Sequence, residues 1–287
     1  MKNYFSLIKF SHTIFALPFA ILGFFLAYLK LGNVFNLQLL FLIVLCMIFA
    51  RSAAMGFNRY LDRDIDKDNP RTIGREIPAG VISASSALLF VIVNSLLFIL
   101  TTWFINPLVL ALSPVALLIT LGYSYTKRFT FLCHFVLGMG LALAPIGAYL
   151  AAGGGFDLVP ILYSIAVLFW VAGFDIMYAL QDEDFDKKHN LSSVPVFLGK
   201  KNALNLSRGL HSISALSFVY AAYTLLHTYE TFGSLLLVAT LIFAGMLYYQ
   251  HRLVKADDLS RINLAFFTTN GVASLIYGTL VILDIFI

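Results

Sequence analysis

The sequence predicts an all-α, polytopic membrane protein with nine transmembrane helices in two weakly similar halves around a central cavity. Sixty per cent of its 287 residues are hydrophobic and 12% are charged, whereas a soluble domain carries about 25% charged residues. The apolar residues gather into runs of about 20, the length that crosses a bilayer as a helix. We expect a single integral-membrane domain over residues 1–287, whose net charge of +4 reflects loops at one membrane face and implies no nucleic-acid partner.

Nine apolar runs define the predicted helices. They span residues 12–30, 36–60, 83–104, 106–123, 131–152, 159–181, 206–227, 233–251 and 264–286. The first run follows Lys2 and Lys9 and resembles a signal peptide at its start. It is long, however, and no small-residue cleavage site clearly ends it, so we interpret it as a retained membrane helix.

Lysine and arginine are concentrated in alternate loops. They occupy the N-terminal segment and the loops after the second, fourth, sixth and eighth helices, whereas the other membrane side has only Lys30. Basic loops are favoured on the cytoplasmic side. The sequence therefore predicts a multi-pass protein of the inner (cytoplasmic) membrane, with the N-terminus in the cytoplasm and the C-terminus on the far side.

Two acidic segments lie where the second and sixth helices end. Residues 58–67 and 178–187 match at a constant offset of 120 positions. The matched residues are Asp62, Asp64, Asp66 and Lys67 in the first segment and Asp182, Asp184, Asp186 and Lys187 in the second. Charge near a bilayer is costly, so two matching acidic clusters predict a functional site. The alternative is that they cap membrane helices and balance nearby lysines.

Helical spacing places these side chains on two stripes, because positions three, four or seven residues apart share a helix face. The stripes comprise Arg51, Asn58, Asp62 and Asp66 on the second helix and Asp175, Tyr178, Asp182 and Asp186 on the sixth. If the stripes face each other, four carboxylates and one amide converge at the cytoplasmic mouth of a cavity. Mg²⁺ prefers such oxygen ligands together with substrate phosphate oxygens. We therefore expect Asn58, Asp62, Asp66, Asp182 and Asp186 to hold Mg²⁺.

Basic residues near the acidic clusters predict a phosphorylated substrate. Arg71 and Arg75 follow the first cluster, and Tyr123 and Lys127 lie one turn apart at the end of the fourth helix. Arginine forks and lysine ammonium groups both suit phosphate oxygens. Ordinary positive loop charge is the alternative for each residue, but adjacency to an acidic cluster favours phosphate binding for Arg71 and Lys127.

Arg51 and Asp175 lie deeper in the membrane. Each precedes a metal-site residue by seven positions, which places it about 10 Å further along its helix. Neither could face lipid, so the simplest partner of each is the other or a substrate. We expect them to line a substrate pocket with Arg51 near a substrate carboxylate, and a structural ion pair is the alternative.

These motifs, taken together and in order, resemble the UbiA superfamily of intramembrane aromatic prenyltransferases. The resemblance covers nearly the whole chain and includes the family patterns N-x-x-x-D-x-x-x-D, R-T-x-x-R, Y-x-x-x-K and D-x-x-Y-A followed by D-x-x-x-D. The matching residues are Asn58, Asp62 and Asp66; Arg71, Thr72 and Arg75; Tyr123 and Lys127; Asp175, Tyr178 and Ala179; and Asp182 and Asp186. The predicted nine helices also agree with the family.

The resemblance implies a reaction and a role for each residue. Mg²⁺ held by the aspartate motifs binds a polyprenyl diphosphate, and loss of diphosphate leaves an allylic carbocation that a ring carbon of an aromatic acid attacks. The implied catalytic residues are Asp62, Asp66, Asp182, Asp186 and Asp175. The implied diphosphate-binding residues are Asn58, Arg71, Arg75, Tyr123, Lys127 and Tyr178.

The acceptor expected from the resemblance is 4-hydroxybenzoate or a dihydroxynaphthoate, as in ubiquinone or menaquinone synthesis. Residues 8–13 lack the arginine usual in hydroxybenzoate enzymes, and residues 75–78 read Arg-Glu-Ile-Pro in place of R-P-L-P. These departures look more like the futalosine branch of menaquinone synthesis, and we expect Lys9, His12 and Arg51 to contact the acceptor. Alternatives are another acceptor (heme-type, chlorophyll-type or homogentisate) or a cation or proton transporter, which should place its acids at mid-membrane.

Overall fold

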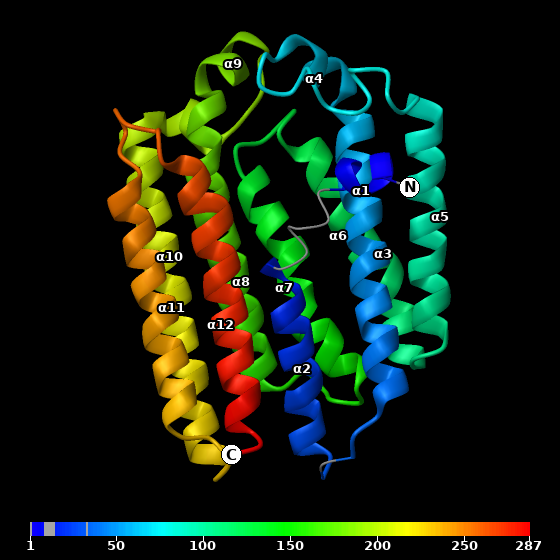
Figure 1. The fold of residues 1–287 in the computed structure, drawn as a ribbon, viewed down its shortest axis with the longest axis vertical. Coiled ribbons are helices and arrows are strands. Elements are labelled where there is room, and N and C mark those ends of the chain that lie inside the picture. Colours follow the sequence, from blue (N-terminus) through cyan, green and yellow to red (C-terminus); the bar gives the residue numbers. More distant parts are fainter. Residues whose placement is uncertain (1, 9–14, 33) are drawn as a thin grey trace.

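The computed structural model describes residues 2–8, 15–32 and 34–287, and within these ranges every regular element is helical (Figure 1). Eight of the described helices are long and apolar enough to cross a membrane, and α2 (Leu17–Lys30) is a further, shorter apolar helix. The predicted all-α membrane fold is confirmed, and these helices correspond to the nine apolar runs of the sequence.

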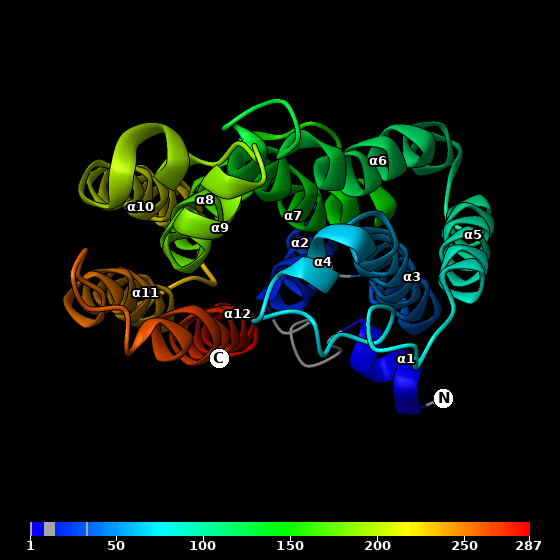
Figure 2. The same cartoon turned by 90° about the horizontal axis from the view of Figure 1, so that it is seen from above.

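The remaining elements follow in chain order. They are α1 (Lys2–Leu7), α3 (Leu37–Leu61), α4 (Arg63–Asp68), α5 (Ala84–Trp103), α6 (Pro107–Thr126), α7 (Cys133–Ala151), α8 (Leu158–Ala179), the 3₁₀ turn η2 (Leu180–Asp182), α9 (Glu183–Lys188), α10 (Val194–Thr228), α11 (Ser234–Leu253), the π-helical turn η3 (Leu264–Thr268) and α12 (Thr269–Asp284). The short helices α4 and α9 lie at the same end of the bundle, and Figure 2 looks onto that end.

Most helix boundaries match the sequence prediction to within a few residues because the chain supplies caps there. The side chains of Asn36, Ser83 and Asn106 each accept a hydrogen bond from a backbone N–H three residues further on. Such a cap satisfies one of the backbone donors that the first helical turn leaves unpaired. These residues therefore fix the starts of α3, α5 and α6.

The predicted start of α10 at residue 206 is wrong. The helix begins at Val194 and, after a kink at Gly199, whose φ is 74°, continues through residues 200–205, four of which are polar. Glycine adopts a positive φ without steric cost. The chain can therefore change direction at Gly199 and enter the long helix several residues before the apolar run begins.

Both acidic segments interrupt a membrane helix at the matched aspartate. Asp62 joins α3 to α4 with φ −87° and ψ 2°, and Asp182 joins η2 to α9 with φ −101° and ψ 3°. The helix is therefore interrupted within each predicted stripe, although the N–H of Asp66 still bonds to the carbonyl of Asp62 at 2.7 Å. The matching interruptions agree with two similar halves.

The largest hydrophobic core lies among α2, α8, α10, α11 and α12, and hydrogen bonds pair several of the polar side chains buried in it. The indole N–H of Trp170 donates to Asn270 at 2.8 Å, and the hydroxyl oxygens of Tyr163 and Tyr277 lie 3.0 Å apart. Unpaired polar groups are costly where no water can reach them. Packing in this core holds α8 in position, and the end of α8 carries the second acidic segment.

Helices α7 and α8 approach closely at Gly138. A Cβ atom at this position would lie 2.5 Å from the carbonyl oxygen of Leu168, so the contact requires a residue without a side chain. Small residues at such crossings let membrane helices pack backbone to backbone.

The substitution Gly138→Ala should therefore destabilise the protein by about 1–3 kcal/mol, because the two backbones must separate. Thermal unfolding in detergent would measure the loss. Gly147→Ala is the matched control on the same helix, since a Cβ there meets no heavy atom within 4 Å. Equal melting temperatures for the two variants would contradict the close-contact argument.

Candidate active site

A polar cavity of about 150 Å³ lies where α3, α4, η2 and α9 meet. Eight of the predicted metal- or diphosphate-binding residues line it: Asn58, Asp62, Asp66, Arg71, Arg75, Lys127, Asp182 and Asp186. The folding of the chain thus brings the two acidic segments together with three of the predicted phosphate-binding cations.

Asp62 is the most buried carboxylate of this cavity, with its side chain 2% exposed. One oxygen lies 2.7 Å from the ammonium of Lys127 and accepts from the Asn58 amide at 3.2 Å, and the other accepts from Arg128 at 2.9 Å. Arg128 also donates to the carbonyls of Leu61 and Ser124, which joins the ends of α3 and α6. A carboxylate buried this deeply persists because cations and hydrogen bonds compensate its desolvation.

Residues of the loop that follows α4 form hydrogen bonds that hold Asp66 in place. A single nitrogen of Arg75 donates to both of its carboxylate oxygens, at 2.7 and 2.8 Å. The hydroxyl of Thr72 donates to the Asp66 carbonyl at 3.1 Å, and Asn69 accepts from the backbone N–H of Arg71 at 2.9 Å. These contacts fold the loop back over the first acidic segment.

Arg71 crosses from the first acidic segment to the second. Its guanidinium forms a two-pronged pair with Asp182 at 2.9 and 2.5 Å and donates to the hydroxyl of Tyr178 at 3.2 Å. Burial alone would lower the pKa of Arg71, but the Asp182 carboxylate outweighs it and the net effect is a raised pKa. The pair is therefore a charged link between the two halves.

Asp186 shares the cavity with these pairs and is hydrogen-bonded by the Ser193 side chain. In the described ranges, no three His, Cys, Asp or Glu side chains are grouped closely enough to hold a metal ion. The physical reason is that Asp62, Asp66 and Asp182 each point at a cation. The donor set nevertheless has the oxygen chemistry that divalent Mg²⁺ prefers, with four carboxylates and the amide of Asn58 around one cavity.

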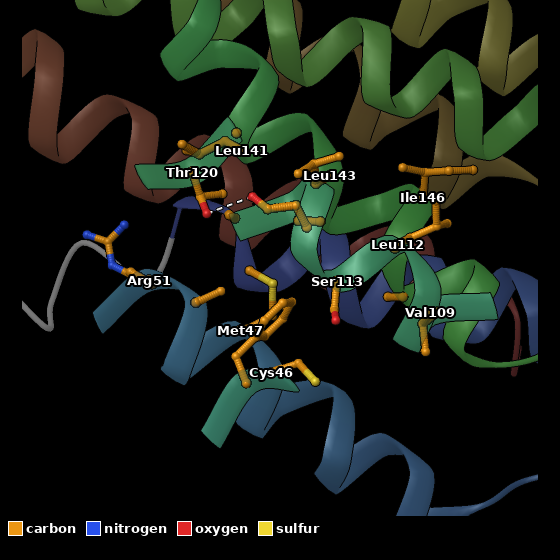
Figure 3. A pocket seen from close by; sticks show the side chains of 18 of the residues that line it. Cys46, Met47, Arg51, Val109, Leu112, Ser113, Thr120, Leu141, Leu143 and Ile146 are labelled. Atoms are coloured by element: carbon orange, nitrogen blue, oxygen red, sulfur yellow. Dashed lines mark hydrogen bonds between the residues drawn. The ribbon is translucent and has the colours of Figure 1, made fainter. Parts of the chain in front are cut away.

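An apolar cavity of about 340 Å³ lies among α2, α3, α5, α6 and α7. Figure 3 shows Arg51 at one end of it and Val109 towards the other, with Met47 and Ser113 between them. Tyr123 also lines this cavity, while Lys127, one turn further on, lines the polar cavity. The end of α6 therefore contributes to both cavities.

Arg51 and Asp175 do not pair with each other, so the alternative of a structural ion pair is wrong. Among the described residues the Nε of Arg51 is buried without a hydrogen-bond partner. Asp175 is bonded at 2.7 Å to Nδ1 of His134, a residue of α7. Depth in the membrane was the basis for that alternative, and depth does not determine which helix faces lie together.

Two predicted residues, Lys9 and His12, lie outside the described residues. Sequence analysis also missed Arg128 and His134 as site residues. Arg128 could have been found, because it adjoins Lys127 and follows the same motif. His134 carried no signal, since its partner is 41 positions away on another helix.

Comparison with known proteins identifies the family of the chain. A family model described as "UbiA prenyltransferase family" matches residues 16–272. A 4-hydroxybenzoate octaprenyltransferase of Tolumonas auensis is 31% identical over 252 residues, which are 88% of this chain and 86% of the relative. Its counterpart in Aliivibrio fischeri (strain MJ11) is 30% identical over 243 residues, or 84% and 82% of the two chains.

Solved structures show the same fold. A UbiA homolog from Aeropyrum pernix K1 superposes with a TM-score of 0.83 at 32% identity, covering 95% of this chain and 98% of the homolog. A UbiA homolog from Archaeoglobus fulgidus, solved bound to DMAPP and Mg²⁺, superposes with a TM-score of 0.74 at 22% identity, covering 99% of each chain. The fold and the matched sequences define an integral-membrane prenyltransferase. The chain belongs to the UbiA prenyltransferase family.

Proposed function

We propose that this protein transfers a polyprenyl group from a polyprenyl diphosphate to a ring carbon of an aromatic carboxylic acid, with Mg²⁺, in respiratory quinone biosynthesis. The observation that carries the proposal is the polar cavity, where four carboxylates and three cations from both halves converge. Its neighbour is a larger, almost wholly apolar cavity that shares the end of α6. The two cavities suit the two ends of one amphipathic substrate.

The diphosphate end would lie in the polar cavity. Arg71, Arg75 and Lys127 now pair with aspartates, and each can exchange that partner for a phosphate oxygen, since all three are partly exposed. Mg²⁺ held by Asn58, Asp62, Asp66, Asp182 and Asp186 would neutralise the charge of the departing diphosphate. Tyr178, bonded to Arg71, would keep its guanidinium in place.

The isoprenoid chain and the acceptor would occupy the apolar cavity. Its hydrocarbon lining would keep water away from the allylic cation that forms as diphosphate departs. Arg51 offers a buried nitrogen without a partner among the described residues, and a planar guanidinium suits a carboxylate. An aromatic acid would thus be oriented by Arg51, with Tyr123 between the acceptor and the diphosphate.

Two acceptors fit this arrangement. The curated relatives at 30–31% identity are 4-hydroxybenzoate octaprenyltransferases, which favours 4-hydroxybenzoate. The sequence of residues 75–78 favours a dihydroxynaphthoate instead, and the solved Archaeoglobus fulgidus homolog bound to GPP and Mg²⁺ supports the shared diphosphate chemistry. The basic loops further suggest that the polar cavity opens towards the cytoplasm in an inner membrane.

The direct test is prenyl transfer by the purified protein with Mg²⁺ and a long-chain prenyl diphosphate. We would offer 4-hydroxybenzoate and 1,4-dihydroxy-6-naphthoate in parallel and measure diphosphate release and the prenylated product. Turnover is expected with one of the two acids and should stop when the metal is chelated. If folded protein turned over neither acid, the proposed acceptor class would be contradicted.

The substitution Asp62→Asn should lower the turnover number by about 100-fold or more. The reason is that the site loses a carboxylate that would hold Mg²⁺, and Mg²⁺ would neutralise the charge of the departing diphosphate. The matched control is Asp64→Asn, since the Asp64 side chain is 84% exposed and that of Asp62 is 2% exposed. Both variants should accumulate in the membrane. Near-normal turnover by Asp62→Asn would contradict the metal–diphosphate role of the first acidic segment.

The substitution Arg51→Gln should raise the KM for the aromatic acid by about 10-fold or more, the cost of one charged hydrogen bond. The KM for the prenyl diphosphate should remain unchanged, because the polar cavity is left intact. Steady-state kinetics with each substrate varied in turn would measure both values. A lower protein yield with unchanged KM values would instead assign Arg51 a structural role.

A further inference from the structure

The π-helical turn η3 begins the last membrane helix and lies against the end of α8. In a π turn the backbone hydrogen bonds join residues five positions apart instead of four, and such turns are rare and frequently lie at functional sites. Ala265 and Phe266 are both in η3. The proposed reaction gives no residue of this turn a role.

Asn270 holds the carbonyl groups of the turn in place. Its side chain is fully buried, and the amide nitrogen donates to the carbonyls of Phe266 and Ala265 at 2.8 and 3.3 Å. The amide oxygen accepts from Trp170 at 2.8 Å and from Gln250 at 2.6 Å. An indole N–H can only donate, so Trp170 determines which end of the amide faces the turn. Residues of α8 and α11 therefore stabilise the geometry of η3.

The turn places the ring of Phe266 against the last turns of α8. The ring centroids of Phe266 and Tyr178 are 4.1 Å apart and the ring planes differ by 29°, which is a stacked arrangement. Phe174, one turn earlier, meets Phe266 edge-on, with centroids 5.2 Å apart and planes at 86°. Aromatic pairs with these geometries attract each other beyond simple burial. Phe266 thus contacts α8 at two successive turns and restricts the orientation of Tyr178.

Tyr178 connects this stack to the polar cavity. Its hydroxyl accepts from Arg71 at 3.2 Å, and the guanidinium carbon of Arg71 lies 5.4 Å from its ring centroid. Within the described part of the chain, the side chain of Arg71 forms hydrogen bonds with Tyr178 and Asp182 alone. If Arg71 exchanges Asp182 for a phosphate oxygen, Tyr178 is the protein partner that remains. The orientation of Tyr178 therefore matters most when a diphosphate is bound.

We propose that Phe266 is a positioning residue for diphosphate binding: its stacked ring holds Tyr178, and Tyr178 keeps the guanidinium of Arg71 directed at the polar cavity. The inference rests on the proposed function, which gives Arg71 a phosphate oxygen as its ligand. It adds a specific requirement for an aromatic ring at position 266. It also makes an arginine of the first half depend on a turn in the second half.

Binding of geranyl diphosphate with Mg²⁺, measured without an acceptor, tests this role. Phe266→Leu keeps an apolar side chain but removes the stacked ring, and we expect it to weaken binding about 3- to 10-fold, which corresponds to the loss of one aromatic pair. Phe266→Tyr keeps the ring and should bind as tightly as the wild-type protein. Unchanged affinity in Phe266→Leu, or an equal loss in both variants, would overturn the proposal.

Phe243→Leu is the matched control for packing. The Phe243 side chain is fully buried in the largest hydrophobic core, and its ring packs against aromatic side chains other than Tyr178 and Phe266. We expect this variant to have a lower melting temperature and an unchanged affinity for geranyl diphosphate. A loss of affinity as large as that of Phe266→Leu would indicate a general loosening of the core and would contradict positioning.

A double-mutant cycle tests whether Phe266 acts through Tyr178. In the Tyr178→Leu background the stack is already lost, so Phe266→Leu should cause no further loss of affinity. A full additional loss would show that Phe266 acts by another route and would overturn the proposal.

Nitrogen-15 NMR of the arginine-labelled protein gives a readout that needs no ligand. The Nε resonance that disappears in Arg71→Lys should shift in Phe266→Leu and stay in place in Phe243→Leu. An unmoved resonance in Phe266→Leu would overturn the proposal. If the wild-type protein bound no prenyl diphosphate, the proposed function would fail, and this resonance would still show whether Phe266 determines the position of Arg71.

Discussion

The organisation of this protein depends on the neutralisation of buried carboxylates at the boundary between the two halves. The negative charge of Asp62 is compensated by Lys127 and Arg128 at the end of α6, and that of Asp182 by Arg71 from the opposite half. In an apolar bundle, a carboxylate that loses its partner carries an uncompensated desolvation cost of several kcal/mol. These pairs therefore hold α3, α6 and α8 in the relation that creates the polar cavity.

The same pairs make the cavity responsive to anionic ligands. Each cation that now neutralises an aspartate has a geometry that also suits a phosphate oxygen. Because Arg71 links the halves and lies in a loop folded over the first acidic segment, a change of partner at this residue would alter how tightly that loop closes. Anion binding and closure of this loop would then both result from the same exchange of ion-pair partners at Arg71.

Much of this arrangement could be predicted from sequence, and the exceptions have physical causes. The repeat around Asp62 and Asp182 predicted their convergence because matched segments end equivalent helices at the same membrane face. Depth in the membrane allowed an ion pair between Arg51 and Asp175 as an alternative, but depth says nothing of helix rotation, and Asp175 contacts His134 instead. The early start of α10 was missed because apolar periodicity begins several residues after the kink at Gly199.

The interruption of each motif helix at its aspartate has an electrostatic consequence. A helix carries about half a negative charge at its C-terminal end, and α3 and α8 both end at the polar cavity, at Leu61 and Ala179. The short helices α4 and α9 begin at the same two places, at Arg63 and Glu183, and their positive N-terminal ends offset part of that charge. The charge of the cavity is thus set by its acidic and basic side chains rather than by the helix axes, so replacing one side chain changes it directly.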